Sequence, residues 1–267
     1  MFNNSFINIA IEAAILAGNT IMEVYATDFE VSVKNDSSPL TLADFRANEI
    51  ITTLLNQTNI PIISEESKEV AYEVRKNWTS CWMVDPLDGT KEFIKKNGEF
   101  TVNIAFIQHQ KPIFGIIYVP VERMLFVGNT VDMKAYKAHV PEGTSFNSNM
   151  FVAQHELPVP ATNVNYIRIV ASKSHLSPET EEYIARQSEV YGQVELLSKG
   201  SSLKFCLVAE GLADLYPRFA PTMEWDTAAG QAICEAVGLS VIDQVTQIPM
   251  LYNRQNLLNN SFLVCAN

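Results

Sequence analysis

Two acids, Asp85 and Asp88, lie in the segment DPLDGT (residues 85–90), directly after the apolar run CWMV. A strand that ends in a tight turn holds both carboxylates at one edge of a sheet. Asp-Gly turns are common in loops, however, and a local side-chain hydrogen bond would explain this segment when it is taken alone. The chemistry of the pair therefore depends on which other groups join it.

Other acids also stand at the ends of predicted elements. Glu65 follows the short apolar strand NIPIIS, where acidic residues are usually solvated. Asp226 opens a predicted helix, so a role as helix N-cap would account for it. Asp44 comes three residues after Thr41 and fits a capping box with it. Each of these acids has a purely structural explanation by itself.

Taken together, these acids form an oxygen-only set of potential metal ligands. Hard cations such as Mg²⁺ prefer carboxylate and carbonyl oxygens, whereas Zn²⁺ favours nitrogen and sulfur. Carboxylates that share one pocket raise each other's pKa unless cations neutralise them. Spacing alone leaves open whether these strand ends meet in space.

The overall charge limits the class of partner. The 267 residues carry a formal net charge of −11, which argues against a protein that binds nucleic-acid polymers. The same charge would repel an anionic small molecule, so bound cations or local Lys and Arg side chains would have to reverse the sign inside a phosphate site.

Cysteine usage and the N-terminal segment predict a cytoplasmic protein. The four cysteines stand far apart, without a zinc or redox motif, and we expect reduced, mostly buried thiols. The N-terminus lacks the basic region of a signal peptide and carries Glu12 in its apolar stretch. No run of 18 uncharged apolar residues predicts a membrane span. Contact with the cytoplasmic face of the inner membrane stays open, as does the oligomeric state.

Helical and alternating apolar patterns interchange along the whole chain, which predicts an α/β or layered α+β fold. Segments 100–108 and 111–121 are expected to form an antiparallel hairpin, and 141–165 a connection. Charged residues in 67–76 and 179–182 are expected to be solvated or in loops. The predicted helices are 6–24, 41–57, 177–191, 202–210 and 226–237; the other predicted strands are 29–34, 59–64, 81–84, 125–129, 135–140, 166–172, 193–198, 213–219 and 261–267.

Three segments resemble the signatures of the inositol monophosphatase superfamily: ISEE (63–66), WMVDPLDGT (82–90) and WDTAAG (225–230). SPLTLAD, NGEFTVNIA, GSSLKFCLVAEG, ADLYPRF and PTMEWDTAAG look most like its CysQ-type 3′(2′),5′-bisphosphate nucleotidases. The resemblance runs from about residue 10 to the end. It implies one unit (1–267) of alternating αβαβα layers, with a metal-binding half (about 1–150) and a substrate-side half (about 151–267).

The resemblance also implies how the acids bind Mg²⁺. Glu65, Asp85 and the Leu87 carbonyl would hold one ion. Asp85, Asp88 and Asp226 would hold a second ion, with Asp85 bridging the two. A third, weaker ion would bind near Glu65 and help to hold the attacking water.

The same resemblance implies roles for the neighbouring residues. Thr90, paired with Asp44, would orient or deprotonate the water. The backbone N–H groups of Gly89 and Thr90 would face the phosphate, as expected at a turn that leads into a helix. Ser64 stands where inositol-type members often have Gly, and this favours the nucleotidase type.

Residues of the second half are expected to bind the substrate. Lys204 lies in the first turn of a helix, which is unfavourable with the helix dipole unless an anion is near. In CysQ-like proteins the positions of His175, Ser201, Lys204 and Arg218 contact the nucleotide and its 5′-phosphate, and Asp226 would lie beside them. Alone, His175 would more often be a surface residue, and Ser201 a helix cap.

The resemblance therefore implies hydrolysis of 3′-phosphoadenosine 5′-phosphate to AMP and phosphate. Direct attack by water is expected, because the C-x₅-R and R-H-G motifs of phospho-enzyme phosphatases are absent. An inositol monophosphatase or sugar bisphosphatase of the same superfamily is the alternative enzyme. A metal- or nucleotide-sensing relative is the non-enzyme alternative, although it would be expected to have lost some of the acids.

Overall fold

The computed structural model describes residues 5–27, 31–33, 39–144, 146–157, 166–171 and 177–266, and only the backbone at 31–33, 39–41 and 148. His175 lies outside the described residues.

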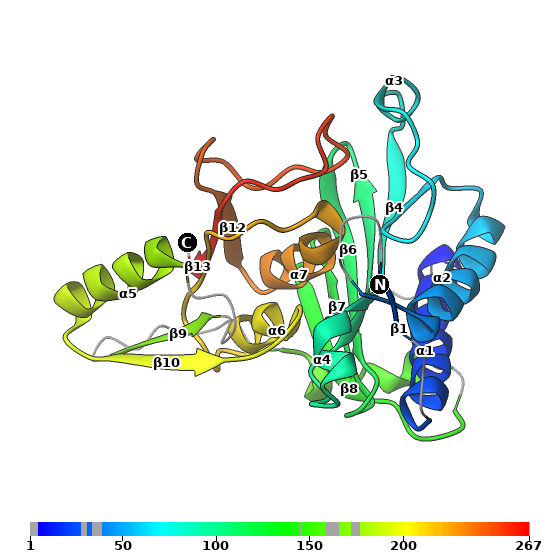
Figure 1. Cartoon of the computed structure of the whole chain (residues 1–267), viewed down its shortest axis with the longest axis horizontal. Coiled ribbons are helices and arrows are strands. Elements are labelled where there is room, and N and C mark those ends of the chain that lie inside the picture. Colours follow the sequence, from blue (N-terminus) through cyan, green and yellow to red (C-terminus); the bar gives the residue numbers. More distant parts are fainter. Residues whose placement is uncertain are drawn as a thin grey trace.

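The elements alternate in layers across the molecule (Figure 1). Helices α1 (Ser5–Tyr25) and α2 (Leu42–Leu55) cover one face of a six-stranded sheet. Helices α6 (Leu203–Ala209) and α7 (Glu224–Ala236) lie between that sheet and a second group of strands, and α5 (Pro178–Tyr191) lies on its outer side. The predicted α/β class with alternating helix and sheet layers is confirmed.

The six-stranded sheet has the order β3-β4-β5-β6-β7-β8. Only the β3–β4 pair is parallel; the others are antiparallel. The predicted hairpin is therefore confirmed as β5 and β6. The strands are β3 (Ile62–Ser64), β4 (Ser80–Asp88), β5 (Thr101–Gln108), β6 (Lys111–Val119), β7 (Met124–Asn129) and β8 (Lys134–His139).

The second group of strands holds a parallel pair, β9 (Ile167–Ala171) with β10 (Val194–Ser198), and an antiparallel sheet of order β11-β13-β12. A bridge between Ile169 and Leu215 joins the two. Strand β12 is absent from the elements predicted from the sequence. The remaining elements are β11 (Tyr216–Arg218), β12 (Leu239–Asp243), β13 (Phe262–Ala266), β1 (Val31–Val33), β2 (Pro39–Thr41), α3 (Tyr72–Arg75), α4 (Thr90–Ile94) and the 3₁₀ turns Asn56–Thr58, Ser148–Met150 and Ala153–His155.

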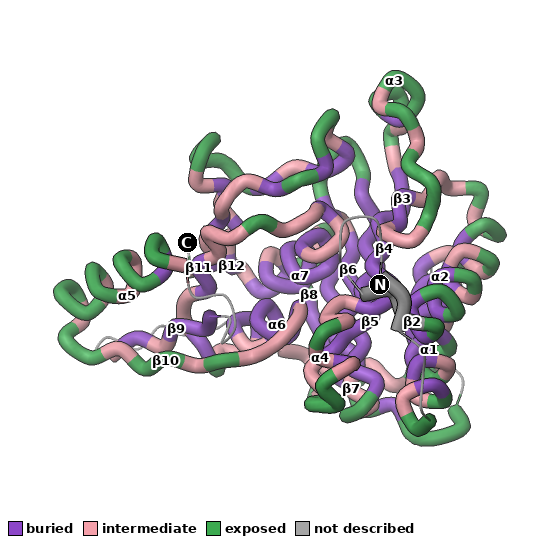
Figure 2. The backbone as a smooth tube through the Cα atoms, viewed as in Figure 1, coloured by how far each residue is buried: buried purple, intermediate pink, exposed green. Residues whose placement is uncertain are grey.

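Two apolar clusters fill the spaces between the layers, and Figure 2 shows the buried segments gathered there. One cluster joins α1 and α2 to the six-stranded sheet; the other joins α6, α7 and residues of both sheets. Phe100, Phe106, Phe114 and Phe126 are buried in these clusters. Among the described helices α1 alone is long and apolar enough to cross a membrane, but its apolar residues form part of the core.

The position of α7 depends on two glycines. Gly115 and Gly128 stand opposite each other in β6 and β7. A Cβ at Gly115 would lie 2.2 Å from the Ala229 carbonyl oxygen, and one at Gly128 would lie 2.5 Å from Ile233 Cα. Both contacts are far below van der Waals distance, so the helix rests directly on the sheet backbone at this point. Any larger side chain would push α7 outward.

The cysteines fit the prediction of reduced thiols. All four are free; Cys81, Cys206 and Cys234 are buried, and Cys265 is partly buried. Burial raises the pKa of the Cys81 thiol to about 12, so it stays protonated at neutral pH.

Several sequence-based expectations are corrected. Strand β4 continues to Asp88, because the DPLD segment stays paired with β5 through a bulge. Asp226 is the third residue of α7 rather than its N-cap, which is Met223. Segment 67–76 is not uniformly solvated: it contains α3, and Arg75 is only 1% exposed.

Candidate active site

The parallel pairing of β3 and β4 brings two of the predicted acids to one sheet edge. Ser64 stands opposite Val84, and the Glu65 N–H donates to the Val84 carbonyl oxygen at 3.2 Å. Glu65 therefore lies beside the point at which β4 reaches Asp85. The Ser64 hydroxyl donates to Asn48 Oδ1 of α2 at 2.7 Å, which ties the end of β3 to the helix that carries Asp44.

Helix α7 brings Asp226 to the same edge. Its first turn contains Asp226, whose Oδ2 accepts a 2.8 Å hydrogen bond from the Met223 N–H. This contact caps the helix and also fixes the carboxyl group, which explains why a capping pattern and a functional acid occupy one position.

The pKa values of Asp85 and Asp226 are shifted by burial and by the other acids. Burial raises the pKa of Asp85 well above its usual range, and the charges of Glu65, Asp88, Asp226 and Asp44 raise it further, in that order. Burial also raises the pKa of Asp226, with Asp88 as the largest neighbouring charge. Four acids, Glu65, Asp88, Asp226 and Asp44, thus act on Asp85, which is 1% exposed.

This donor set suits a hard cation. The five side chains offer carboxylate oxygens only, and their mutual repulsion is of the kind that divalent ions relieve. Within the described ranges no group of three or more His, Cys, Asp and Glu side chains is already arranged around a metal position. The acids therefore lie near one another, but their side chains are not arranged as a metal coordination shell. Their binding of Mg²⁺ stays a prediction.

The turn after β4 has a backbone that requires glycine. Gly89 has φ +93°, and a Cβ there would lie 3.1 Å from the Glu99 carbonyl oxygen. Helix α4 begins at Thr90, whose hydroxyl donates to the Leu87 carbonyl oxygen at 3.4 Å. The Leu87 N–H in turn donates to Asp85 Oδ1 at 3.1 Å. Leu87, Gly89 and Thr90 thus lie beside the acids, where the sequence analysis expected them.

A buried polar chain reaches Asp88 from β5 and α6. The Ser202 hydroxyl donates to Asp88 Oδ2 at 2.7 Å, and Asn103 Nδ2 lies 2.8 Å from Ser202 Oγ. The Thr101 hydroxyl donates to Asn103 Oδ1 at 3.0 Å. Asn103 and Thr101 are not among the site residues predicted from the sequence. A polar side chain amid the apolar run VNIAFI was the signal, because a buried strand position normally carries an apolar residue.

A cavity of about 180 Å³ opens beside Asp88 and Asp226. Ser201, Lys204 and Arg218 line it, together with Lys91 and Tyr216. The cavity brings three of the predicted substrate-binding residues together with the acids. The fourth predicted residue, His175, lies outside the described residues.

One cationic residue of this cavity, Lys204, is buried, which is unusual for a lysine. Lys204 is 5% exposed, and its ammonium group donates to the carbonyl oxygens of Lys199 (3.3 Å) and Ser201. Burial lowers the pKa of Lys204 to about 8, while Asp88 acts in the opposite direction. In the described part of the chain, Ser201 Oγ and Arg218 Nε are buried without a hydrogen-bond partner. A ligand with acceptor oxygens would satisfy both.

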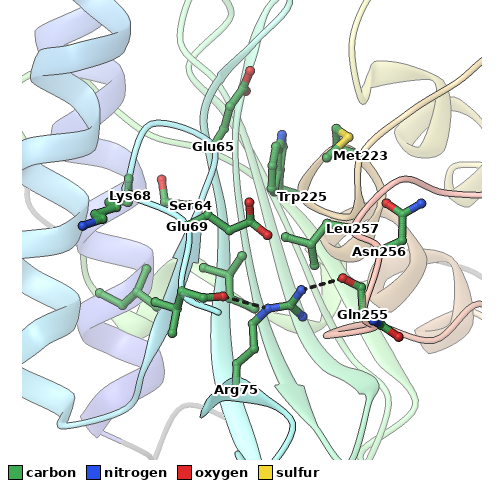
Figure 3. Close-up of a pocket in the computed structure, with 14 residues that line it drawn as sticks. Ser64, Glu65, Lys68, Glu69, Arg75, Met223, Trp225, Gln255, Asn256 and Leu257 are labelled. Atoms are coloured by element: carbon green, nitrogen blue, oxygen red, sulfur yellow. Dashed lines mark hydrogen bonds between the residues drawn. The ribbon is translucent and has the colours of Figure 1, made fainter. Parts of the chain in front are cut away.

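Glu65 lines a second cavity, of about 320 Å³ (Figure 3). Glu65, Glu69 and the Trp225 ring face it. At its base Arg75 donates to backbone oxygens on both sides, to Val70 at 3.1 Å and to Gln255 at 2.9 Å. Arg75 therefore ties the segment that follows Glu65 to the C-terminal region.

The C-terminal region is in turn tied to the start of α7. Glu224 is fully buried and accepts from the Asn253 N–H at 2.6 Å and from Arg254 Nε at 2.9 Å. Burial nevertheless raises the pKa of Glu224 to about 7. Because Glu224 is two residues before Asp226, this network fixes the end of the helix that carries one of the acids.

Comparison with known proteins defines the class. The model of the inositol monophosphatase family matches residues 3–267. The fold is also similar to that of the inositol monophosphatase of Anabaena, with a TM-score of 0.71 at 22% identity over 98% of this chain and 90% of that one. The chain therefore belongs to the inositol monophosphatase family, a family of phosphatases.

The chain is similar over most of its length to proteins called CysQ. The chain is 44% identical over 253 residues to the 3′(2′),5′-bisphosphate nucleotidase CysQ of Escherichia coli O157:H7, covering 93% of this chain and 94% of that protein. Its sequence is 47% identical to that of CysQ from Bacteroides thetaiotaomicron. The crystal structure of that protein matches with a TM-score of 0.87 and covers 99% of this chain and 98% of that one.

Proposed function

We propose that this protein is a Mg²⁺-dependent 3′(2′),5′-bisphosphate nucleotidase that converts adenosine 3′,5′-bisphosphate to AMP and phosphate. The observation that carries the proposal is the junction of two unlike sites. Acids gather around Asp85, and a cavity with the buried Lys204 and the half-buried Arg218 begins at Asp88 and Asp226. A substrate with one phosphate to hydrolyse and a second to anchor fits this junction. The similarity to the CysQ relatives supports the same substrate class.

The acids would hold Mg²⁺ as the sequence predicts. Glu65, Asp85 and the Leu87 carbonyl would bind one ion, and Asp85, Asp88 and Asp226 a second, while a third ion would bind near Glu65. Bound Mg²⁺ supplies charge neutralisation at the phosphate and lowers the pKa of water. Without such compensation five clustered carboxylates would repel a phosphate.

The remaining groups would position the reactants. We assign Thr90, with Asp44, to the orientation of the attacking water and acceptance of its proton. The N–H groups of Gly89 and Thr90 would face phosphate oxygens at the turn into α4. Since a phosphate monoester is very slow to hydrolyse in water, orientation and charge compensation have a large barrier to lower.

The substrate side would recognise the second phosphate. Lys204 is positioned to meet it as a charge, and Ser201 Oγ and Arg218 Nε would donate to its oxygens. A phosphate there would also raise the lowered pKa of Lys204, because an adjacent anion favours the protonated amine. This pocket separates a nucleoside bisphosphate from inositol 1-phosphate, which has no second phosphate.

A paired substrate experiment tests the proposal. Phosphate release is measured with adenosine 3′,5′-bisphosphate, 3′-AMP, inositol 1-phosphate and fructose 1,6-bisphosphate, with Mg²⁺ and with chelator. We expect the adenosine bisphosphate to have the highest kcat/KM and all turnover to need the metal. We expect Lys204→Met to lower kcat/KM for the bisphosphate by about 10- to 100-fold, and to affect 3′-AMP less, because a charge-assisted hydrogen bond to the 5′-phosphate is lost.

Two results would contradict the proposal. Equal losses on both nucleotides would remove Lys204 from 5′-phosphate recognition. Higher kcat/KM for inositol 1-phosphate or fructose 1,6-bisphosphate would assign the protein to another branch of the family. Lys76→Met is a matched control, because Lys76 is 43% exposed and paired with Glu73 on the surface.

A further inference from the structure

The Ser202 side chain lies between two of the acids assigned to Mg²⁺. Its hydroxyl oxygen is 2.7 Å from Asp88 Oδ2 and 3.1 Å from the backbone carbonyl oxygen of Asp226. A serine hydroxyl has a single proton, and the contact with Asp88 Oδ2 is the shorter of the two. The Ser202 proton is therefore directed at the Asp88 carboxylate.

Two buried side chains of β5 fix the orientation of Ser202. Asn103 Nδ2 donates to Ser202 Oγ at 2.8 Å and lies 3.4 Å from Asp88 Oδ2. The Thr101 hydroxyl donates to Asn103 Oδ1 at 3.0 Å. The amide oxygen of Asn103 therefore faces Thr101, and its amide nitrogen, the hydrogen-bond donor, faces Ser202. Thr101, Asn103 and Ser202 are 0%, 1% and 2% exposed, so water does not compete for these contacts.

These contacts reach only one of the two carboxylate oxygens of Asp88 among the described residues. Within the part of the molecule that the structure describes, the hydrogen bonds to Asp88 all reach Oδ2. Oδ1 is then left for another partner. We propose that Ser202, held by Asn103 and Thr101, is a positioning residue that turns Asp88 Oδ1 toward the cation; this inference rests on the proposed function.

Ser202 also connects the cation site with the substrate cavity. It directly precedes α6, and its neighbours Ser201 and Lys204 line the cavity. Residues 101 and 103 belong to β5 of the first sheet, whereas 202 belongs to the second half of the chain. Docking of the substrate-side half onto β5 therefore completes the support of Asp88. A cation-binding defect is expected when this contact is lost, even though Ser202 itself binds neither metal nor substrate.

The experiment compares Ser202→Ala with Ser202→Thr, which keeps the hydroxyl, and with Ser188→Ala on the exposed face of α5 as a control. Binding of Mn²⁺ to the full-length protein is measured by calorimetry without substrate. We expect Ser202→Ala to weaken binding by about 10- to 100-fold, the usual effect of losing a hydrogen bond to a metal ligand. Ser202→Thr and Ser188→Ala should bind like the wild type.

Kinetics separate positioning from a general structural role. A positioning role predicts that Ser202→Ala needs about 10- to 100-fold more Mg²⁺ for half-maximal phosphate release, while saturating Mg²⁺ restores most of kcat. An unchanged Mg²⁺ requirement, with kcat lowered at every Mg²⁺ concentration, would overturn the inference. Asn103→Leu should shift the Mg²⁺ requirement in the same direction as Ser202→Ala, and an Asn103→Leu protein with wild-type Mn²⁺ affinity would also overturn it.

Failure of the inference is distinguishable from failure of the proposed function. A wild-type protein that binds Mn²⁺ and hydrolyses the bisphosphate, with a Ser202→Ala variant of equal Mn²⁺ affinity, overturns only the inference. If the wild type binds Mn²⁺ but hydrolyses no bisphosphate, the function is wrong, and the comparison of Mn²⁺ affinities still decides the role of Ser202. A wild type that binds no divalent cation overturns both.

Discussion

Arg75 and Asn253 are joined by two reciprocal hydrogen bonds across 178 residues of sequence. The Arg75 guanidinium donates to Asn253 Oδ1 at 3.0 Å, and Asn253 Nδ2 donates to the Arg75 carbonyl oxygen at 2.8 Å. Arg254, the next residue, pairs with Glu224 at the start of α7. A continuous polar network thus runs from the segment that follows Glu65 to the helix that carries Asp226. It braces two parts of the candidate cation site against each other.

The first prediction concerns this network. Arg75→Met should lower the free energy of unfolding by at least about 2 kcal/mol, because several buried carbonyl and amide oxygens lose their donor. Urea denaturation measures the change. Lys76→Met removes a neighbouring surface cation and should change the free energy by no more than about 0.5 kcal/mol. Equal effects of the two variants would show that Arg75 is not a structural brace.

The second prediction concerns the acid at the centre of the cluster. Asp85→Asn should reduce phosphate release by more than about 100-fold, since the assigned shared ligand loses its charge. The metal-free variant should unfold at the same or a higher temperature than the wild type, because a neutral amide replaces a buried carboxyl group whose ionised form is disfavoured by burial and by the neighbouring acids. Addition of Mg²⁺ should raise its Tm less than that of the wild type.

Asp132→Asn is the control for this variant, because Asp132 lies in the turn after β7, away from the acids. Near-normal turnover of Asp85→Asn at saturating Mg²⁺ would show that the assignment of two ions to Asp85 is wrong.

The third prediction is a pH dependence of stabilisation by metal. Burial raises the pKa of Asp85 and Asp226 in the metal-free folded protein. The folded protein therefore keeps protons on these acids at a pH at which the unfolded chain has already released them. Its stability from these groups is therefore present at low pH and is lost as pH rises through the raised values. Mg²⁺ requires the ionised carboxylates and competes with those protons.

Thermal unfolding with Mg²⁺ and with chelator checks this sign. We expect the rise in Tm on adding Mg²⁺ to be larger at about pH 8.5 than at about pH 6. A rise in Tm that is constant with pH, or that shrinks toward high pH, would contradict the protonation of these acids in the metal-free protein.

The fourth prediction concerns the charge of Lys204. Its amine loses a proton as pH rises through about 8, so the proposed 5′-phosphate site loses the charge of Lys204 there, while Arg218 stays positively charged. We expect kcat/KM for adenosine 3′,5′-bisphosphate, relative to 3′-AMP, to fall above that pH. The ratio cancels changes in the chemistry common to both substrates. In Lys204→Met the ratio should be low and independent of pH, and a wild-type ratio that stays constant through this range would exclude Lys204 as the titrating group.

The fifth prediction concerns the contact of α7 with the sheet. Gly115→Ala should lower the free energy of unfolding by about 1–3 kcal/mol, because the new methyl group would overlap the Ala229 carbonyl oxygen. It should also weaken Mg²⁺ binding, since α7 carries Asp226. Denaturation and calorimetry measure the two effects. An unchanged stability would mean that the sheet and helix adjust without strain.

Local patterns in the chain mark the candidate residues one by one, whereas their joint role as Mg²⁺ ligands is implied by the resemblance to the inositol monophosphatase superfamily. The segment DPLDGT has an acid pair at the end of an apolar run, and Gly89 is needed for a backbone with φ +93°. The buried aromatic residues of the hairpin follow the strand period of two. These properties depend on neighbours within a few residues, so a linear pattern contains them.

Other features were decided only by the tertiary structure. Whether Glu65, Asp85 and Asp226 meet depends on the parallel pairing of β3 with β4 and on the glycine contact that seats α7. Arg75 lies in a charged segment that suggests a solvated loop, yet partners near residue 253 bury it. Burial and long-range pairing depend on side chains far away in the sequence, and these contacts determine the pKa of Lys204 and the orientation of Ser202.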